Sequence, residues 1–215
     1  MQKGVKYAII AAVALLLLYN SVYFRKLSEV QAEATTRQFD AKAYAERMWT
    51  ETLPPRLQEA QELDTLVTLL RTQPEATFEK HSNALGIGNL RYFLVKGEGT
   101  LTAIHENDMT LALKGGTDVR LATEFIFGNA VRDASGLVDI QEFDNTMDIN
   151  YISEELNAII RQNVVPPFKQ QAKVGEQVHF TGAIQLNKAH LDLKSIEIIP
   201  ISLESQPSSV SEENS

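Results

Sequence analysis

The chain has 215 residues, with 20 Lys and Arg against 28 Asp and Glu, a formal net charge of −8, 44% apolar residues and no cysteine. This length suits one domain or two small ones and is sufficient to bury a core. Disulfides, thiolate zinc sites, cysteine nucleophiles and lipid anchors on a cysteine are excluded, because each needs a cysteine. The acidic balance argues against a nucleic-acid partner, since binding to phosphates depends on Lys and Arg.

An apolar stretch over residues 7–24 is the first predicted element. As a helix it would be about 27 Å long at about 1.5 Å per residue, close to the roughly 30 Å hydrocarbon core of a bilayer. Tyrosines at both ends are typical of the membrane interface. We therefore predict a transmembrane anchor, with a buried soluble helix as one alternative. The anchor residues predicted from this stretch are Tyr7, Leu15, Leu18, Tyr19 and Tyr23.

A cleaved signal peptide is the other interpretation of this stretch, but its apolar region is usually about 7 to 15 residues long and is followed closely by small residues. The best small-residue match, at residues 30–32, comes well after the apolar core. Lys3 and Lys6 on one side balance Arg25 and Lys26 on the other, so the positive-inside rule is nearly neutral. A short basic tail and an acidic body favour a single-pass protein of the cell membrane, with its bulk on the extracytoplasmic, periplasmic side.

Helices are predicted next, beginning with Asp40 as an N-cap and carrying the only tryptophan, Trp49. Pro54 and Pro55 are expected to end this helix and to start the next. An apolar stripe over residues 57–70 predicts an amphipathic helix, and a short helix is expected from Glu75 to His81.

From Leu90 onward the pattern alternates and predicts strands, with one inserted helix capped by Asn150 or Ser153 and ending before Pro166. The run Gly-x-x-Val-x-Phe-x-Gly over residues 175–182 suggests a small Greek-key barrel of the oligonucleotide/oligosaccharide-binding (OB) type, although any curled antiparallel sheet would use the same residues. The predicted strands cover 90–105 (bent at its glycines), 109–113, 119–122, 174–184 and 195–201, with 125–134 and 137–143 leaning towards β-structure.

These patterns predict an α+β fold: an N-terminal transmembrane helix, a short helical layer, and a bent antiparallel sheet or OB-like β-barrel with an inserted helix. The tail is rich in Ser and Glu and is expected to be disordered. The predicted segments are an anchor (1–24), a juxtamembrane stalk (25–38), a helical segment (39–89), a β-rich OB-like domain (90–204) with its inserted helix (151–164), and a disordered tail (205–215).

Five stretches of the sequence resemble a bacterial family, the DUF2291 predicted periplasmic lipoproteins. The resemblance implies an extracytoplasmic, membrane-tethered protein in genomic settings that often include sugar transporters of the ATP-binding-cassette type, and it implies no catalytic residues. The chain departs from the lipoprotein members in lacking cysteine, so the apolar helix would have to replace the lipid as the tether. The matching stretches are residues 39–44 with Trp49, 92–99, 128–134, 143–145, and 178–183 with Leu186 and Asn187.

Side chains able to recognise a polar ligand concentrate after residue 128. Arg132 beside Asp133 places a fixed donor fork next to an acceptor, close to an amide and an aromatic ring, a combination that suits a sugar. The alternative is that Arg132 and Asp133 form a buried tie that fixes a β-turn. The predicted ligand-binding residues are Asn129, Arg132, Asp133, Phe143 and Asn145.

Catalytic and metal chemistry find little support in the sequence. The histidines have no paired spacing, so no metal and no cofactor are predicted. A carboxylate cluster at Asp139, Glu142, Asp144 and Asp148 could perform acid/base chemistry, but a solvated loop and a helix N-terminus would use the same residues. We therefore expect a non-enzymatic binding or accessory protein for a sugar transporter or another envelope complex. The alternatives are a structural adaptor that binds protein around Trp49 and Leu57 and, more distantly, a carboxylate-dependent hydrolase.

Overall fold

The computed structural model describes Gly4, Tyr7 and residues 39–206. The predicted stalk and four of the predicted anchor residues, Leu15, Leu18, Tyr19 and Tyr23, lie outside the described residues, as do residues 207–215. Within the described part of the chain, no helix combines the length and the apolar character needed to cross a bilayer. The anchor therefore stays a sequence-based prediction. The folded unit that contains the barrel begins at Asp40.

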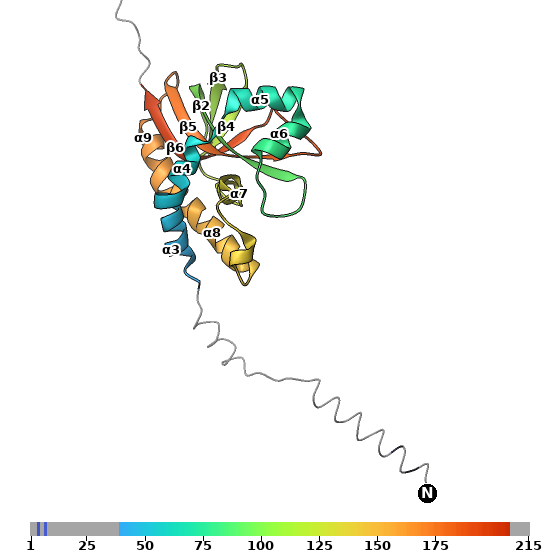
Figure 1. The fold of residues 1–215 in the computed structure, drawn as a ribbon. Coiled ribbons are helices and arrows are strands. Elements are labelled where there is room, and N and C mark those ends of the chain that lie inside the picture. The colour runs from blue at the N-terminus through green and yellow to red at the C-terminus, as the bar shows by residue number, and fades with distance from the viewer. Residues whose placement is uncertain (1–3, 5–6, 8–38, 207–215) are drawn as a thin grey trace, which may run out of the picture. The chain divides into compact units, whose positions relative to one another are not determined.

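Five strands close into a barrel (Figure 1). The order around the barrel is β2-β3-β4-β6-β5, and β5 pairs back to β2. Every pairing is antiparallel except β4 with β6. A two-residue strand, β1 (Gln61–Glu62), adds to β2 in parallel on the outside. The barrel strands are β2 (Leu90–Ile104), β3 (Asp108–Leu113), β4 (Asp118–Ala122), β5 (Gln177–Asn187) and β6 (Glu197–Gln206).

The long first strand bends at its glycines, as the sequence predicts. Residues Leu90 to Thr100 of β2 pair with β5, and residues Gly99 to Ile104 pair with β3. A Cβ atom at Gly99 would lie 3.0 Å from the Ala112 carbonyl oxygen, so a side chain at this position would crowd the backbone of β3. The bend lets one strand belong to both sides of the barrel and thereby closes it.

Alternate residues of the strands fill the barrel. Phe93, Leu101, Met109 and Leu111 are completely buried there. Helices α5 (Leu63–Thr72) and α6 (Pro74–His81) contribute to the same core, and Phe78 of α6 meets Phe93 edge to face with ring centroids 5.4 Å apart. The core therefore extends from the barrel into the helical layer that precedes it.

The first helices form a nearly continuous rod: α3 (Ala41–Arg47), a π-helical turn η1 (Met48–Thr52), and α4 (Leu53–Gln58). Asp40 caps α3 as predicted, its Oδ1 accepting a hydrogen bond from the Ala43 amide at 2.9 Å. Pro54 and Pro55 lie in the first turn of α4 and so start a helix, as predicted, but the preceding helix does not stop there, because the chain continues through η1. The Leu53 amide donates to the Met48 carbonyl, and this π turn leads into the first turn of α4, where proline is tolerated because its missing N–H needs no partner.

The single helix predicted over residues 57–70 is also wrong. Helix α4 ends at Gln58, the chain turns to form β1, and α5 starts only at Leu63. Gln61 pairs with Val95 of β2, so pairing with the barrel edge interrupts the helix. Leu57 and Ala60 happen to continue the period of α5, which is why the pattern alone could not show the break. Helix α6 is present as predicted.

The predicted strands over 125–134 and 137–143 are wrong as well. The chain instead forms a loop, the short helix α7 (Ala130–Ser135) and a 3-10 turn η2 (Ile140–Glu142). Every residue of α7 is buried, so no polar face marks it as a helix in the sequence. Gly136 ends α7 in the left-handed conformation, with φ 64°.

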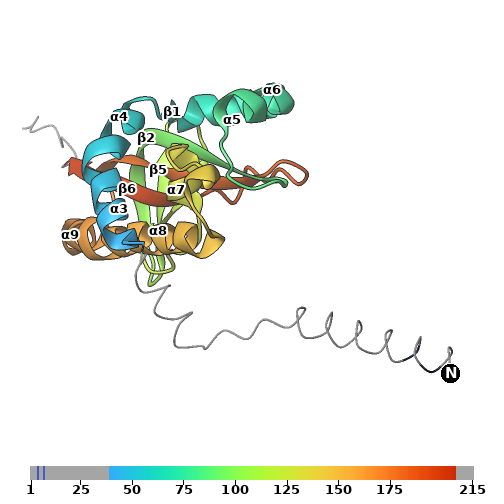
Figure 2. The ribbon, with the colours of Figure 1, turned by 60° about the horizontal axis from the view of Figure 1, so that its bottom comes forward.

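The inserted helix is longer than predicted at both ends. Helix α8 (Thr146–Ile159) starts after Asn145, and it continues through the π turn η3 (Ile160–Val164) into α9 (Val165–Gln171). The prolines predicted to stop it occupy the first turn of α9, the same arrangement as in α4. Helices α3 and α8 pack together, and α7 lies between α8 and the barrel strands β2 and β5 (Figures 1 and 2).

The last strand also departs from the sequence prediction. Ser205 and Gln206, predicted to belong to the disordered tail, form the end of β6, where Ser205 pairs with Val178. The remaining part of that predicted tail, residues 207–215, lies outside the described residues.

Candidate functional site

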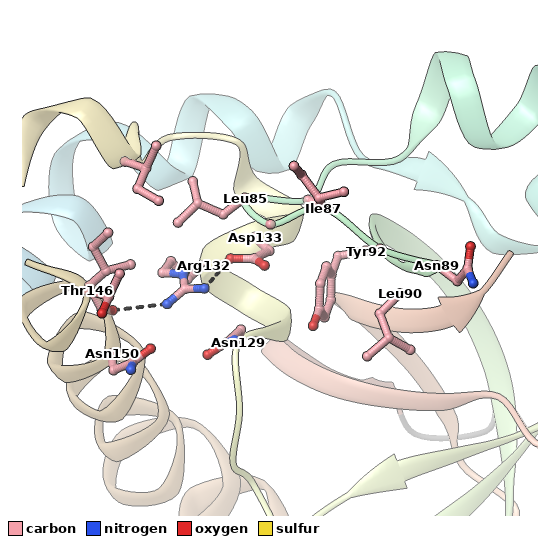
Figure 3. A pocket seen from close by; sticks show the side chains of 15 residues that line it. Leu85, Ile87, Asn89, Leu90, Tyr92, Asn129, Arg132, Asp133, Thr146 and Asn150 are labelled. Atoms are coloured by element: carbon pink, nitrogen blue, oxygen red, sulfur yellow. Dashed lines mark hydrogen bonds and ion pairs between the residues drawn. The ribbon is translucent and has the colours of Figure 1, made fainter.

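A cleft of about 310 Å³ opens beside α7 (Figure 3). The loop over residues 84–89 and Leu90, the first residue of β2, form one side, and the N-terminal part of α8 with Ile140 of η2 forms the other. Arg132 and Asp133 of α7 and Tyr92 of β2 also line it. The cleft thus lies where the helical insertion meets the start of the first barrel strand.

A buried ion pair lies at the cleft wall. The Nε and Nη2 atoms of Arg132 each lie 2.7 Å from Oδ1 of Asp133, and both side chains are only 5% exposed. The Nη1 atom of Arg132 donates to the Ile149 carbonyl oxygen of α8 at 3.1 Å. The pair therefore ties α7 to α8 while facing the cleft.

Helix α7 is held in place by side chains from other elements. Arg56 of α4 donates through Nε to the Ser135 carbonyl oxygen at 3.0 Å, and Asn83 donates through Nδ2 to the Ala134 carbonyl oxygen at 2.9 Å. The Ser135 hydroxyl donates to the Arg132 carbonyl oxygen at 2.6 Å. These bonds satisfy the carbonyl groups that a helix end leaves without partners, so the short helix has a defined position.

Tyr92 adds a phenol to the cleft. Its side chain is buried, and Figure 3 shows it on β2, beside Asp133. Burial raises the pKa of Tyr92 above its usual value of 10.0, the Asp133 carboxylate raises the pKa further, and Arg132 opposes this. The hydroxyl is therefore protonated at neutral pH and can donate a hydrogen bond. It makes none to the other residues that the structure describes.

Amide side chains supply further polar groups in the cleft. Asn129 precedes α7, Asn150 belongs to α8 and Asn89 belongs to the loop before β2. Within the described residues, none of these three side chains is engaged in a hydrogen bond to protein. Leu85 and Ile149 provide apolar surface beside them. Polar groups with unused hydrogen-bonding capacity beside apolar walls are typical of a site for a small molecule.

The structure brings together three of the predicted ligand-binding residues, Asn129, Arg132 and Asp133, at the cleft. It places Phe143 elsewhere, against Tyr44 of α3, with ring centroids 5.7 Å apart. Asn145 is also outside the cleft lining and caps α8, its Oδ1 accepting from the Asp148 amide at 3.0 Å. The buried tie considered as an alternative exists as well, but it joins two helices rather than fixing a β-turn.

The carboxylate cluster does not converge on the cleft. Asp139 caps η2 by accepting from the Gln141 amide at 2.9 Å, and Asp148 accepts from the Asn145 side chain at 2.9 Å. Glu142 and Asp144 are exposed. Across the described residues, no three His, Asp or Glu side chains are grouped so that they could hold a metal ion.

The loop over residues 84–89 and Tyr92 were not predicted from the sequence to contribute to a site. One signal was available: Tyr92 to Val95 is an unbroken apolar run, and all four residues are buried. A strand that is buried on both faces must be covered on its outer face, and α7 is one element that packs on β2. That cover creates the cleft.

A second hollow, of about 290 Å³, follows the seam between α3 with η1 and α8 with η3. Half-buried Trp49 lines it together with Glu46 and Glu155. Leu57, the other residue predicted for an adaptor surface, is half-buried in α4 and does not line this groove.

The fold and the cleft define a small closed barrel of the OB type with a helical insertion. The sequence model of the family described as "Predicted periplasmic lipoprotein (DUF2291)" matches residues 12–204, so the chain belongs to the DUF2291 family. Family membership indicates an extracytoplasmic protein. Among solved structures, an OB-fold protein from Thermotoga maritima is 29% identical, with a TM-score of 0.71, over 79% of this chain and 100% of that chain. No curated protein matches the chain.

Proposed function

We propose that this protein is a non-catalytic binding module on the periplasmic side of the cell membrane, and that its cleft holds a small polar ligand such as a sugar. The observation that carries this proposal is the set of unengaged polar groups around the buried Arg132–Asp133 pair. Asn89 and Asn150 are exposed and Asn129 is half-buried, so these groups are open to a ligand, which can replace the water that solvates them.

Binding rather than catalysis is supported by the kinds of residue in the cleft. Asp133 is the only carboxylate among its described lining residues, and Arg132 holds it at hydrogen-bond distance. No His, Ser or Lys of the described chain lines the cleft, so the usual nucleophiles and bases are lacking there apart from Tyr92, Asp133 and Thr146.

Nucleic acid is disfavoured as a ligand by the outer surface of β3 and β4, the strands that correspond to the usual binding face of an OB barrel. Neither strand contains an aromatic residue on which a base could stack. The exposed Arg120 of β4 lies 3.9 Å from Glu197, which offsets its charge.

Tethering through the apolar segment over residues 7–24 is part of the proposal. The family is described as lipoprotein, but this sequence contains no cysteine that could be acylated. The DUF2291 resemblance also associates such proteins with sugar transporters, and we propose that a transporter of this class is the membrane partner.

The binding proposal is tested by thermal shift on the detergent-solubilised full chain with a panel of sugars, amino acids and organic acids. At least one compound should raise the melting temperature, because a ligand that binds only the native state stabilises it. The shift should be lost in Asn129→Ala with Asn150→Ala. The matched control is Asn107→Ala in the exposed β2–β3 turn, which should keep it. The absence of any shift would contradict the proposal.

An adaptor function is the second candidate, favoured by the groove around Trp49. In this case a membrane protein should copurify with the full chain, and Trp49→Ala should abolish this copurification. The double variant Asn129→Ala with Asn150→Ala should have no effect on it. The reverse pattern would assign the partner surface to the cleft instead.

A further inference from the structure

The cleft has no net charge. Among the described residues that line it, Arg132 and Asp133 are the only ones with side chains that are charged at neutral pH. Two nitrogen atoms of Arg132 lie 2.7 Å from one oxygen atom of Asp133, so the two charges compensate each other within the wall. A ligand that carried a charge would lose its hydration without gaining an unpaired counter-charge.

The same pair retains hydrogen-bonding capacity towards the cleft. A guanidinium group has five N–H donors in a fixed fork, and Arg132 uses three, towards Asp133 and the Ile149 carbonyl. Both contacts on the carboxylate involve Oδ1, and no other described residue donates to Oδ2 of Asp133. A donor and an acceptor are therefore free side by side.

A hydroxyl group fits this arrangement because it donates and accepts at the same time. One hydroxyl can donate to Oδ2 of Asp133 while it accepts from Arg132, and a neighbouring hydroxyl can do the same with the Asn129 amide or with Tyr92. A phosphate or carboxylate would instead have to compete with Asp133 for Arg132 and lie beside a second negative charge. The net charge of the chain, −8, disfavours anions further.

We propose that the cleft selects an uncharged polyhydroxylated molecule of about the size of a monosaccharide, and that the Arg132–Asp133 pair recognises its hydroxyl groups. This inference rests on the proposed function and names the chemistry of its ligand. The volume of about 310 Å³ lies at the lower end of the range for ligand sites, about 300 to 1,000 Å³, which favours a small ligand. Leu85 and Ile149 offer apolar surface for the C–H faces of a sugar ring.

The test compares neutral and charged compounds of the same size. The full chain in detergent is titrated with glucose, galactose, xylose and myo-inositol, and with glucose 6-phosphate, glucuronate and glucosamine. At least one neutral compound should bind, and its charged counterpart should bind at least about 10-fold more weakly. Tighter binding of a charged compound at the cleft would overturn the inference and leave the proposed function standing. If none of these compounds binds, the inference is wrong, whereas the proposed function fails only if the amino acids and organic acids of the thermal-shift panel also produce no shift.

Variants test whether the Arg132–Asp133 pair is responsible for the selectivity for neutral compounds. Asp133→Asn leaves Arg132 without its counter-charge. It should therefore weaken binding of the neutral ligand about 10-fold or more, and it should strengthen binding of glucuronate relative to that of glucose. Asp118→Asn removes the same charge at an exposed position of β4 and should leave the selectivity unchanged. Should Asp133→Asn fail to fold, Tyr92→Phe removes one hydroxyl and should weaken the neutral ligand several-fold. Unchanged selectivity in a folded Asp133→Asn, or unchanged affinity in Tyr92→Phe, would count against the assignment.

Discussion

Arg132 and Asp133 are the residues on which both the position of α7 and the chemistry of the cleft depend. Arg132 reaches from α7 to the Ile149 carbonyl of α8, and Asp133 fixes the guanidinium that makes this contact. Replacing both partners by apolar groups can cost little in such pairs, whereas removing one leaves a buried charge alone. The two side chains therefore act as one unit in stability as well as in recognition.

We expect Arg132→Ala to lower the free energy of unfolding by about 3–5 kcal/mol, because it leaves Asp133 buried without its partner. Urea denaturation measures this. Arg120→Ala is the control. Arg120 is half-exposed and lies 3.9 Å from Glu197, so its substitution should lower the free energy of unfolding by less than about 1 kcal/mol. Equal losses in the two variants would contradict the account of the buried pair.

Tyr92 should make stability depend on pH in the alkaline range. Its folded-state pKa lies above the unfolded value of about 10, so the unfolded chain releases this proton first and stability falls as the pH rises through that range. The contribution is fully present below pH 10. Tyr92→Phe should therefore lose less stability than the wild type between about pH 9 and pH 11, as measured by denaturation at each pH. A steeper loss in the variant would contradict the raised pKa.

At the scale of the element, the barrel depends on places where strands approach too closely for a side chain. A Cβ atom at Gly182 of β5 would lie 2.5 Å from the Ile199 carbonyl oxygen of β6 and 2.6 Å from Cγ2 of Ile198, beside an irregularity in the register. The neighbouring backbone cannot give way without moving β6.

Gly182→Ala should consequently destabilise the protein by about 1–3 kcal/mol, the cost of overpacking a close-packed interior. Gly86→Ala, where nothing lies within 4 Å of the added Cβ, should be close to neutral. Thermal unfolding of the two variants measures the difference, and similar melting temperatures would show that β6 adjusts freely.

Asn145 should contribute to the stability of the fold but not to ligand binding. Its side chain caps α8, so Asn145→Ala should cost about 1 kcal/mol of stability, as lost N-caps do. Ligand affinity should stay within about 2-fold of the wild type, because Asn145 does not line the cleft. A large loss of affinity with unchanged stability would restore Asn145 to the site, where the sequence analysis had put it.

At the scale of the whole molecule, the proposed topology places the barrel outside the cytoplasm behind one membrane segment. The full chain should remain in the membrane fraction at alkaline pH, and protease added to spheroplasts should degrade it. Deletion of residues 7–24 should release the protein from the membrane fraction, because that stretch supplies the apolar length. Protection of the protein from added protease would contradict this topology and place the barrel on the cytoplasmic side.

The five barrel strands, the bend in β2, the Asp40 cap and the OB-like barrel could be predicted from the sequence, because each depends on alternation, turn residues or a cap within one short stretch. The apolar pattern was misleading where tertiary contacts decided the structure. Pairing with β2 interrupts the helical period near Ala60, and burial on all sides conceals α7.

Only part of the candidate site could be predicted from the sequence, because tertiary contacts bring the rest of it together. Asn129, Arg132 and Asp133 are close in sequence and could be singled out together. Tyr92 and the loop before it reach them only because α7 packs on β2. Composition and local pattern thus determined the class of fold, the lack of thiol chemistry and the predicted tether, since these depend on residue types and their spacing. The cleft was decided by the tertiary structure alone, because it forms between segments that meet only when the barrel closes.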